Sequence, residues 1–117
     1  MTPEPAAGRS EVVRAVAGGG PFRELRERLS GAPPGPLECA GLWGCAGALV
    51  LAALGAETGR TILVACPGAE DAESLEEDLT GFSPLEVRGF PAWDVLPGET
   101  DAPESDCLAA RLRALEA

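Results

Sequence analysis

Residues 37–66, LECAGLWGCAGALVLAALGAETGRTILVAC, hold the pattern from which the fold is predicted. Their last six residues, TILVAC (61–66), form a continuous apolar run, which is typical of a strand buried on both faces of a parallel sheet. Residues 45–56 are apolar nearly all round, so the helix that they predict must be covered on several sides. A further strand is expected at 37–42, separated from this helix by a turn of small residues. The stretch therefore predicts strand, turn, helix and strand in succession.

The same alternation continues toward the C-terminus. An amphipathic helix is expected at 69–79, a half-exposed strand at 85–89, a proline-marked loop at 90–103 and a last helix from about 104. Alternating strands and helices predict a parallel sheet with right-handed crossovers. We therefore predict an α/β fold: a partial three-layer, P-loop-like domain with a short parallel sheet of about three strands and flanking helices.

The residues before this pattern differ in composition and divide the chain. Residues 1–36 are expected to be an N-terminal leader and helical extension, and residues 37–117 an incomplete, degenerate P-loop-like α/β domain. Within the first part, 1–9 predict a disordered leader and 11–17 a short helix, whereas 21–29 predict a helix with apolar residues on one face.

Charge and composition exclude several classes of function. The net charge is −10, all nine positive residues are scattered arginines, and histidine is absent. Direct nucleic-acid binding is therefore not expected, because phosphate contacts need a clustered basic face. No apolar run is long enough to span a membrane, and the first residues do not resemble a secretory signal. The cytoplasm is the expected location.

Four cysteines, Cys39, Cys45, Cys66 and Cys107, are irregularly spaced. No two of them form the close pair that a zinc site requires, so no metal site is predicted. We expect small, buried, apolar residues in a reducing compartment.

The turn before the apolar helix is compared with a phosphate-binding loop, G-x-x-x-x-G-K-[ST]. Gly47 stands where the phosphate-binding Lys belongs and Ala48 where the Mg²⁺-binding hydroxyl belongs, and the chain contains no Lys. Losing both contacts costs several kcal/mol, because each charge-assisted contact contributes roughly 1.5–3 kcal/mol. We therefore expect a degenerate nucleotide site, no catalytic residue, no metal ligand and no cofactor for this chain. The vestigial loop comprises Gly41, Gly44, Cys45, Ala46, Gly47 and Ala48.

Three segments taken together resemble a known family. They are GLWGCAGALVLAAL, TILVACPGAEDAESLEEDL and FPAWDVLPGETDAPESDCLAARLRAL, and the most specific piece is FPAWDVLP (90–97) followed by Arg111-Leu112. In this order and spacing they resemble the N-terminal region of bacterial transcription-repair coupling factor over roughly residues 20–117. The motif positions expected to have a structural or partner role are Phe90, Pro91, Trp93, Asp94, Leu96 and Pro97.

The resemblance implies a non-catalytic role for this segment. It implies a domain similar to the first domain of the helicase-like excinuclease B protein, with a decayed nucleotide site. The full-length parent is implied to be an ATP-dependent DNA translocase that needs ATP and Mg²⁺, displaces RNA polymerase stalled at DNA lesions and recruits nucleotide excision repair. The excinuclease subunits and RNA polymerase are implied as partners through that parent. The segment itself is implied to be a scaffold that recruits the excinuclease A protein and restrains the motor.

Two other interpretations stay open. One is a fragment of a nucleotide-binding repair protein of the excinuclease B type, which would require a phosphate-binding Lys and a Tyr-rich hairpin, although the chain has neither Lys nor Tyr. The other is an unrelated small α/β interaction module, in which the 90–97 match arises by chance. Phe90 and Trp93 are interpreted as aromatics that hold the loop onto the core, in preference to a partner contact. Arg111 and Arg113 are interpreted as a terminal helix face.

Overall fold

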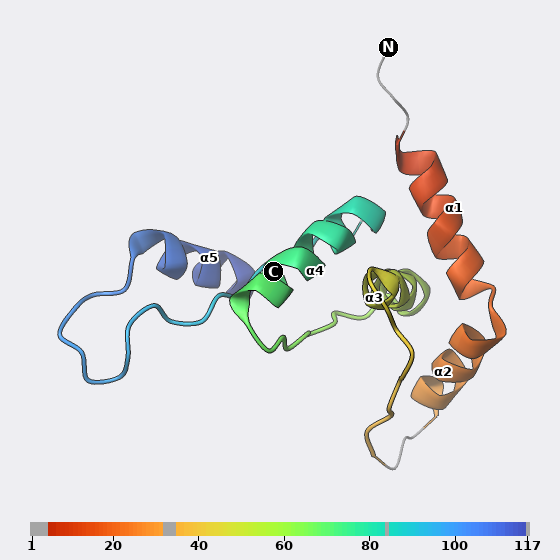
Figure 1. Ribbon diagram of the computed structural model, residues 1–117, viewed down its shortest axis with the longest axis horizontal. Coiled ribbons are helices and arrows are strands. Elements are labelled where there is room, and N and C mark those ends of the chain that lie inside the picture. The colour runs from red at the N-terminus through yellow and green to blue at the C-terminus, as the bar shows by residue number, and fades with distance from the viewer. Residues whose placement is uncertain (1–4, 32–34, 84, 117) are drawn as a thin grey trace.

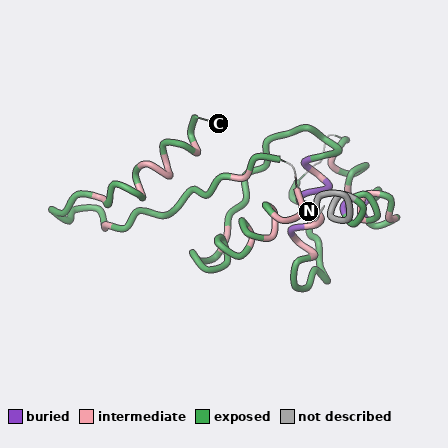
Figure 2. The backbone as a smooth tube through the Cα atoms, turned by 90° about the horizontal axis from the view of Figure 1, so that it is seen from above, coloured by how far each residue is buried: buried purple, intermediate pink, exposed green. Residues whose placement is uncertain are grey.

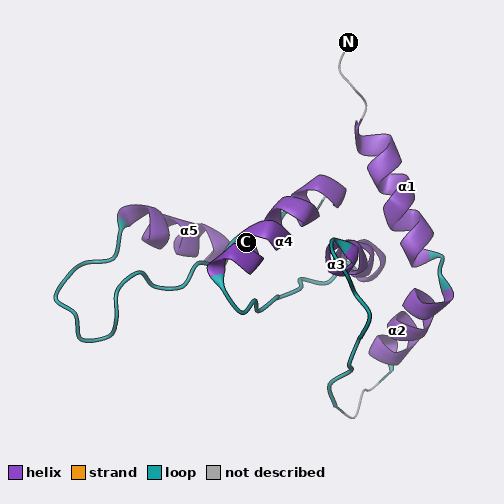
Figure 3. Ribbon diagram, in the orientation of Figure 1, coloured by secondary structure: helices purple, strands orange, loops and turns teal. Residues whose placement is uncertain are grey.

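The computed structural model describes residues 5–31, 35–83 and 85–116, and within these ranges the chain forms five helices and no strand (Figure 1, Figure 3). The helices are α1 (Pro5–Ala17), α2 (Gly20–Ser30), α3 (Ala46–Thr58), α4 (Ala69–Phe82) and α5 (Ser105–Leu115). All five correspond to helices predicted from the sequence. The prediction of a disordered leader is wrong for residues 5–9, which form the first part of α1. Residues 1–4 lie outside the described residues.

The predicted α/β fold with its parallel sheet is wrong. Residues 37–42, 61–66 and 85–89, the three predicted strands, run without regular secondary structure between the helices. In the described parts of the chain, backbone hydrogen bonds outside the helices join residues three or four apart, so no ladder connects these segments. The TILVAC run, predicted to be buried on both faces, instead leaves Leu63 93% exposed.

Helix-on-helix packing explains the difference. The apolar helix α3 is covered by α1 and α4, so other helices supply the cover that we expected from a sheet. Apolar character alone does not distinguish a buried strand from a segment that connects two packed helices.

The core lies where the first four helices meet. Val13 of α1, Phe22 of α2, and Ala52 and Ala53 of α3 form its buried cluster, with Leu79 of α4 packed against it. Figure 2 shows the buried positions gathered at one side of the molecule, and neither α4 nor α5 carries a fully buried residue. Small residues at the centre of α3 allow the neighbouring helices to approach closely.

Gly55, in the last part of α3, marks the closest approach of a connecting segment. A Cβ atom at this position would lie 2.5 Å from Cδ1 of Leu85, so only glycine fits without a shift of that leucine. The segment after α4 is therefore held against α3 by a side chain although it forms no strand.

The molecule is open and flat. Its radius of gyration is 16.8 Å and its principal extents are 53 × 51 × 26 Å, whereas a compact chain of this length has a radius of about 13 Å. Its accessible surface is 9064 Å², against roughly 6,000 Å² for a compact protein of this mass. We call α1–α4 the helical body and residues 90–115 the C-terminal unit; Figure 1 shows α5 and its loop extending away from the body.

Candidate functional site

The residues of the vestigial phosphate loop form a turn into α3, but no strand precedes it in the described part of the chain. Gly41 and Gly44 have φ angles of 79° and 56°, the left-handed region that favours glycine. The Ala46 N–H donates to the Trp43 carbonyl at 3.1 Å, and Cys45 occupies the N-cap without a side-chain cap. The glycine-rich turn therefore exists, whereas these described residues lack the strand that normally aims such a loop.

The two positions at which a phosphate-binding loop would carry Lys and a hydroxyl, Gly47 and Ala48, lie in the first turn of α3. Ala48 is only 1% exposed and Gly47 is half-buried, whereas Cys45 is exposed. A methyl group at Ala48 fills space against the body and offers no oxygen to a metal ion. The helix N-terminus contributes backbone N–H groups and partial positive charge, but neither position adds a cationic side chain.

The 90–97 motif forms the more highly organised cluster. The guanidinium carbon of Arg111 lies 4.0 Å from the ring centroid of Phe90 and 4.2 Å from that of Trp93. The same guanidinium donates a hydrogen bond to the carbonyl of Pro91. An arginine on the faces of two aromatic rings gains cation–π attraction and holds the loop against α5. We call Phe90, Trp93 and Arg111 the aromatic clasp.

Polar contacts extend the aromatic clasp toward the start of α5. Asp94 Oδ2 accepts a hydrogen bond from the backbone N–H of Glu104 at 2.9 Å, and Cys107 Sγ contacts the Ala92 carbonyl at 3.4 Å. Since Glu104 is the N-cap residue of α5, the Asp94 carboxylate also lies at the positive end of this helix. The loop is therefore tied to the start of α5 as well as to its middle.

Leu96 and Pro97 lie at the outer end of the loop. Glu99 Oε2 accepts from the Leu96 N–H at 2.9 Å, and the Glu99 N–H donates to the Leu96 carbonyl at 3.1 Å. Gly98, with φ of 95°, allows the tight turn between them. Both Leu96 and Pro97 are exposed, so this end of the motif faces outward.

The structure corrects the interpretation of several side chains. Phe90 and Trp93 do hold their loop in place, but on Arg111 of α5 and not on the core, and each is about half exposed. Arg111, interpreted as part of a terminal helix face, is the centre of the aromatic clasp. Its place in the motif that carries the family resemblance was the available signal, whereas nothing in the spacing indicated the Asp94–Glu104 contact.

The cysteines were expected to be buried, and this is wrong for two of them. Cys39 and Cys45 are exposed, while Cys66 and Cys107 are half-buried, and all four are free thiols. The segments that were expected to bury Cys39 and Cys66 in a sheet are the irregular connections between helices.

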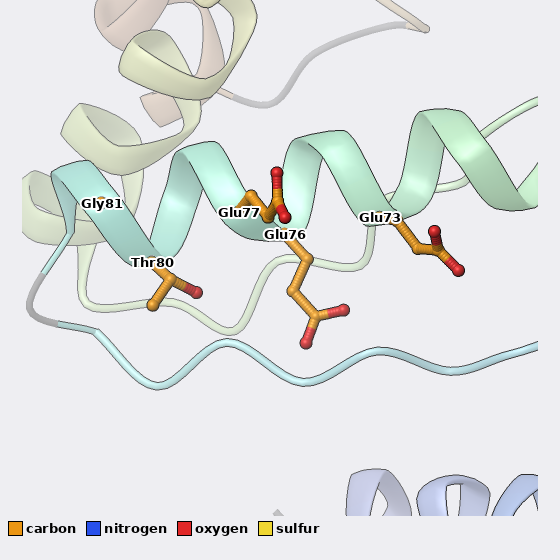
Figure 4. A pocket seen from close by; sticks show the side chains of 5 residues that line it. All are labelled: Glu73, Glu76, Glu77, Thr80 and Gly81. Carbon is orange, nitrogen blue, oxygen red and sulfur yellow. The ribbon is translucent and has the colours of Figure 1, made fainter.

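A shallow depression on α4 is lined by Glu73, Glu76, Glu77, Thr80 and Gly81 (Figure 4). Figure 4 shows the carboxylates of Glu76 and Glu77 pointing in different directions. Glu76 Oε2 instead lies against the chain at Gly89, where an added Cβ would come within 2.8 Å of it. The depression is therefore an open, acidic part of the surface of α4.

No protein-family model, curated protein or solved structure matches this chain. Along the described stretches of the chain, the helices are all too short or too polar to cross a membrane.

Proposed function

We propose that this chain is a non-catalytic scaffold segment of the kind found in the N-terminal region of bacterial transcription-repair coupling factor. In this role it recruits the excinuclease A protein and restrains the motor of its parent protein. The parent uses ATP and Mg²⁺ to displace RNA polymerase stalled at DNA lesions, so the enzymatic activity belongs to the parent and not to this segment. The proposed role places the chain in the cytoplasm, beside RNA polymerase.

The aromatic clasp is the observation that carries this proposal. Phe90, Trp93 and Arg111 all belong to the motif on which the resemblance rests, and they lie together in one cluster. A chance match of letters would give no reason for the arginine of the motif to lie on its two aromatic rings. The cluster therefore supports a motif that acts as a unit, although the domain implied by the resemblance is not the fold observed.

The exposed surface favours an interaction role over catalysis. The accessible area exceeds that of a compact protein by roughly 3,000 Å², which is on the scale of a large protein–protein interface. Part of the exposed apolar surface lies on the C-terminal unit, where Leu96 is 70% and Leu115 is 72% exposed. The positions that would bind a nucleotide and its metal carry Gly47 and Ala48.

A binding assay tests the recruiting role. The full chain is immobilised, and purified excinuclease A protein is passed over it. We expect retention of this protein, weakened by Arg111→Ala and Trp93→Ala because both substitutions open the aromatic clasp. Trp43→Ala is the matched control, since this tryptophan is 84% exposed and lies in a different part of the chain. Absence of retention, or equal weakening by the control, contradicts the proposal.

Calorimetry tests the non-catalytic part of the proposal. Titration of the chain with ATP and Mg²⁺ is expected to give no tight binding, because no Lys or hydroxyl follows the glycine turn. Affinity in the micromolar range, about −8 kcal/mol, contradicts it.

A further inference from the structure

Helix α5 carries an apolar stripe that the aromatic clasp does not use. Leu108, Leu112 and Leu115 are spaced by four and three residues, which places them on one face of the helix. All three are exposed, and Leu115 is 72% exposed. Cys107 and Arg111, which contact the loop, lie on the neighbouring face. We call Leu108, Leu112 and Leu115 the leucine stripe.

Carboxylates lie at both ends of the leucine stripe. Glu104 precedes Leu108 by one helical turn, and Glu116 follows Leu112 by one turn. Residues 90–116 contain six carboxylates and two arginines, a net charge of −4. One of these arginines, Arg111, has its guanidinium on the aromatic rings. Arg88 also contacts this end of α5 by donating to the Arg113 carbonyl, but Glu86 balances its charge in an ion pair. The stripe is therefore an apolar surface with a carboxylate at each end and a net negative charge around it.

We infer that the leucine stripe is a docking surface for a basic amphipathic helix of a partner protein. An apolar stripe with acidic ends is complementary to a helix that has its own apolar stripe flanked by Lys or Arg. Burial of the leucines would supply the affinity. The carboxylates would select a positively charged partner and fix its orientation. The inference deepens the proposed scaffold role, on which its biological purpose rests, by stating the chemistry of the partner.

Charge argues against the other occupants of such a surface. A second copy of the chain would bring like carboxylates together and add another −10 of net charge. An anionic lipid surface attracts Lys and Arg, whereas this surface ends in Glu104 and Glu116. Both occupants are outcomes of the test below.

Calorimetry of the full chain with two synthetic helical peptides provides the test. The peptides share one leucine stripe and carry either Lys or Glu on the remaining positions. We expect the Lys peptide to bind, more weakly as salt is raised, and the Glu peptide not to bind. Leu112→Ser should lower the affinity for the Lys peptide at least about tenfold, because it removes a central apolar contact. Leu63→Ser is the matched control, the same loss of an exposed leucine outside α5.

A second pair of variants separates docking from general attraction to an acidic protein. Glu104→Gln with Glu116→Gln removes two charges beside the stripe, and Glu73→Gln with Glu77→Gln removes two from α4. Only the first pair is expected to lower the affinity for the Lys peptide appreciably. Circular dichroism of each variant checks that the helices are retained.

Several outcomes would overturn the inference. They are equal binding of both peptides, an unchanged affinity in Leu112→Ser, or equal weakening by the two charge pairs. Dimers in sedimentation that Leu112→Ser abolishes would assign the stripe to a second copy. Binding to phosphatidylglycerol vesicles that the same substitution abolishes would assign it to a membrane.

Failure of this inference and failure of the proposed function give different results. If the excinuclease A protein is retained while the Lys peptide does not bind, the docking surface is wrong and the scaffold role stands. If the Lys peptide binds in the expected pattern while the excinuclease A protein is not retained, the coupling-factor role is wrong and the docking surface stands.

Discussion

The helical body and the C-terminal unit are held together by different interactions. In the body, Val13, Phe22 and Ala53 come from three helices and share one buried cluster. In the C-terminal unit α5 buries no residue completely. The contacts there are an arginine on two rings, the Asp94 carboxylate on the Glu104 N–H and hydrogen bonds within the loop. The body therefore depends on removing apolar surface from water, and the unit on the orientation of a few polar groups.

The magnitudes differ accordingly. Burial of one large apolar side chain contributes about 1.5–3 kcal/mol, whereas a cation–π contact at an exposed site contributes about 0.5–1 kcal/mol. The body should therefore control global unfolding, and the unit should loosen locally at smaller cost. The following substitutions test this difference, from the largest effect to the smallest.

Phe22→Ala should be the most damaging substitution. Phe22 is 4% exposed and joins α2 to the core, so its truncation should lower the free energy of unfolding by about 3–5 kcal/mol. Urea denaturation followed by circular dichroism measures the loss. Trp43→Ala removes a larger but exposed aromatic and should change stability by less than about 0.5 kcal/mol. Equal losses would mean that the core does not depend on Phe22.

Ala53→Leu should cause the next largest loss of stability. Ala53 is completely buried where α3 meets the core, and extra methyl groups there would force the helices apart at a cost of about 1–3 kcal/mol. Ala56→Leu, on the exposed face of the same helix, is the control and makes the same change in helix propensity. A shift in thermal midpoint for the control alone would contradict the close packing of α3.

Arg111→Ala should loosen the C-terminal unit and leave the body intact. Two cation–π contacts and a hydrogen bond are lost, which should lower the free energy of local opening by about 1–2 kcal/mol. Amide hydrogen exchange should show faster exchange in α5, with unchanged rates in α3. Arg111→Lys keeps the charge but loses the planar group, so it should restore only part of the protection. Arg113→Ala, in the same turn, is the control and should have little effect. If Arg111→Ala also made exchange faster in α3, the two regions would unfold together.

Glu57→Gln should have the smallest effect. Its carboxylate pairs with Arg26 at 2.8 Å between α3 and α2, but both side chains are more than one-third exposed. Solvent screening limits such a pair to about 0–1 kcal/mol, and the difference should vanish at high salt. Glu38→Gln removes the same charge elsewhere and serves as the control in a salt series of thermal unfolding. A large effect that persists in salt would place this ion pair among the main interactions of the body.

The helices were predictable because their signals are local. Phe22, Leu25 and Leu29 recur at helical spacing, and Pro21 occupies the first turn of α2, so the sequence alone predicted this element. The end of α4 was less accurate, since the helix passes through Gly81 and ends at Phe82. Glycine permits a helix to end but does not force it to, and Phe82 packs against the core.

The candidate site was predictable only in part. The residues 90–97 were identified from their order, and the structure brings Phe90 and Trp93 together. Their partner Arg111 is about twenty residues away, and no local periodicity indicates which charged residue of a helix will meet an aromatic ring. The contact between Asp94 and Glu104 depends in the same way on the path of the loop.

Residue identities and local spacing were enough to predict the five helices, the acidic charge and the missing phosphate-binding Lys. Three features emerged from the packing alone: α1 and α4 cover α3, TILVAC connects two helices without joining a sheet, and Arg111 lies on two aromatic rings. An apolar segment must be covered, but its own sequence does not determine whether a sheet or other helices cover it. That choice is made by the packing of segments that are distant in the sequence, which local periodicity does not encode.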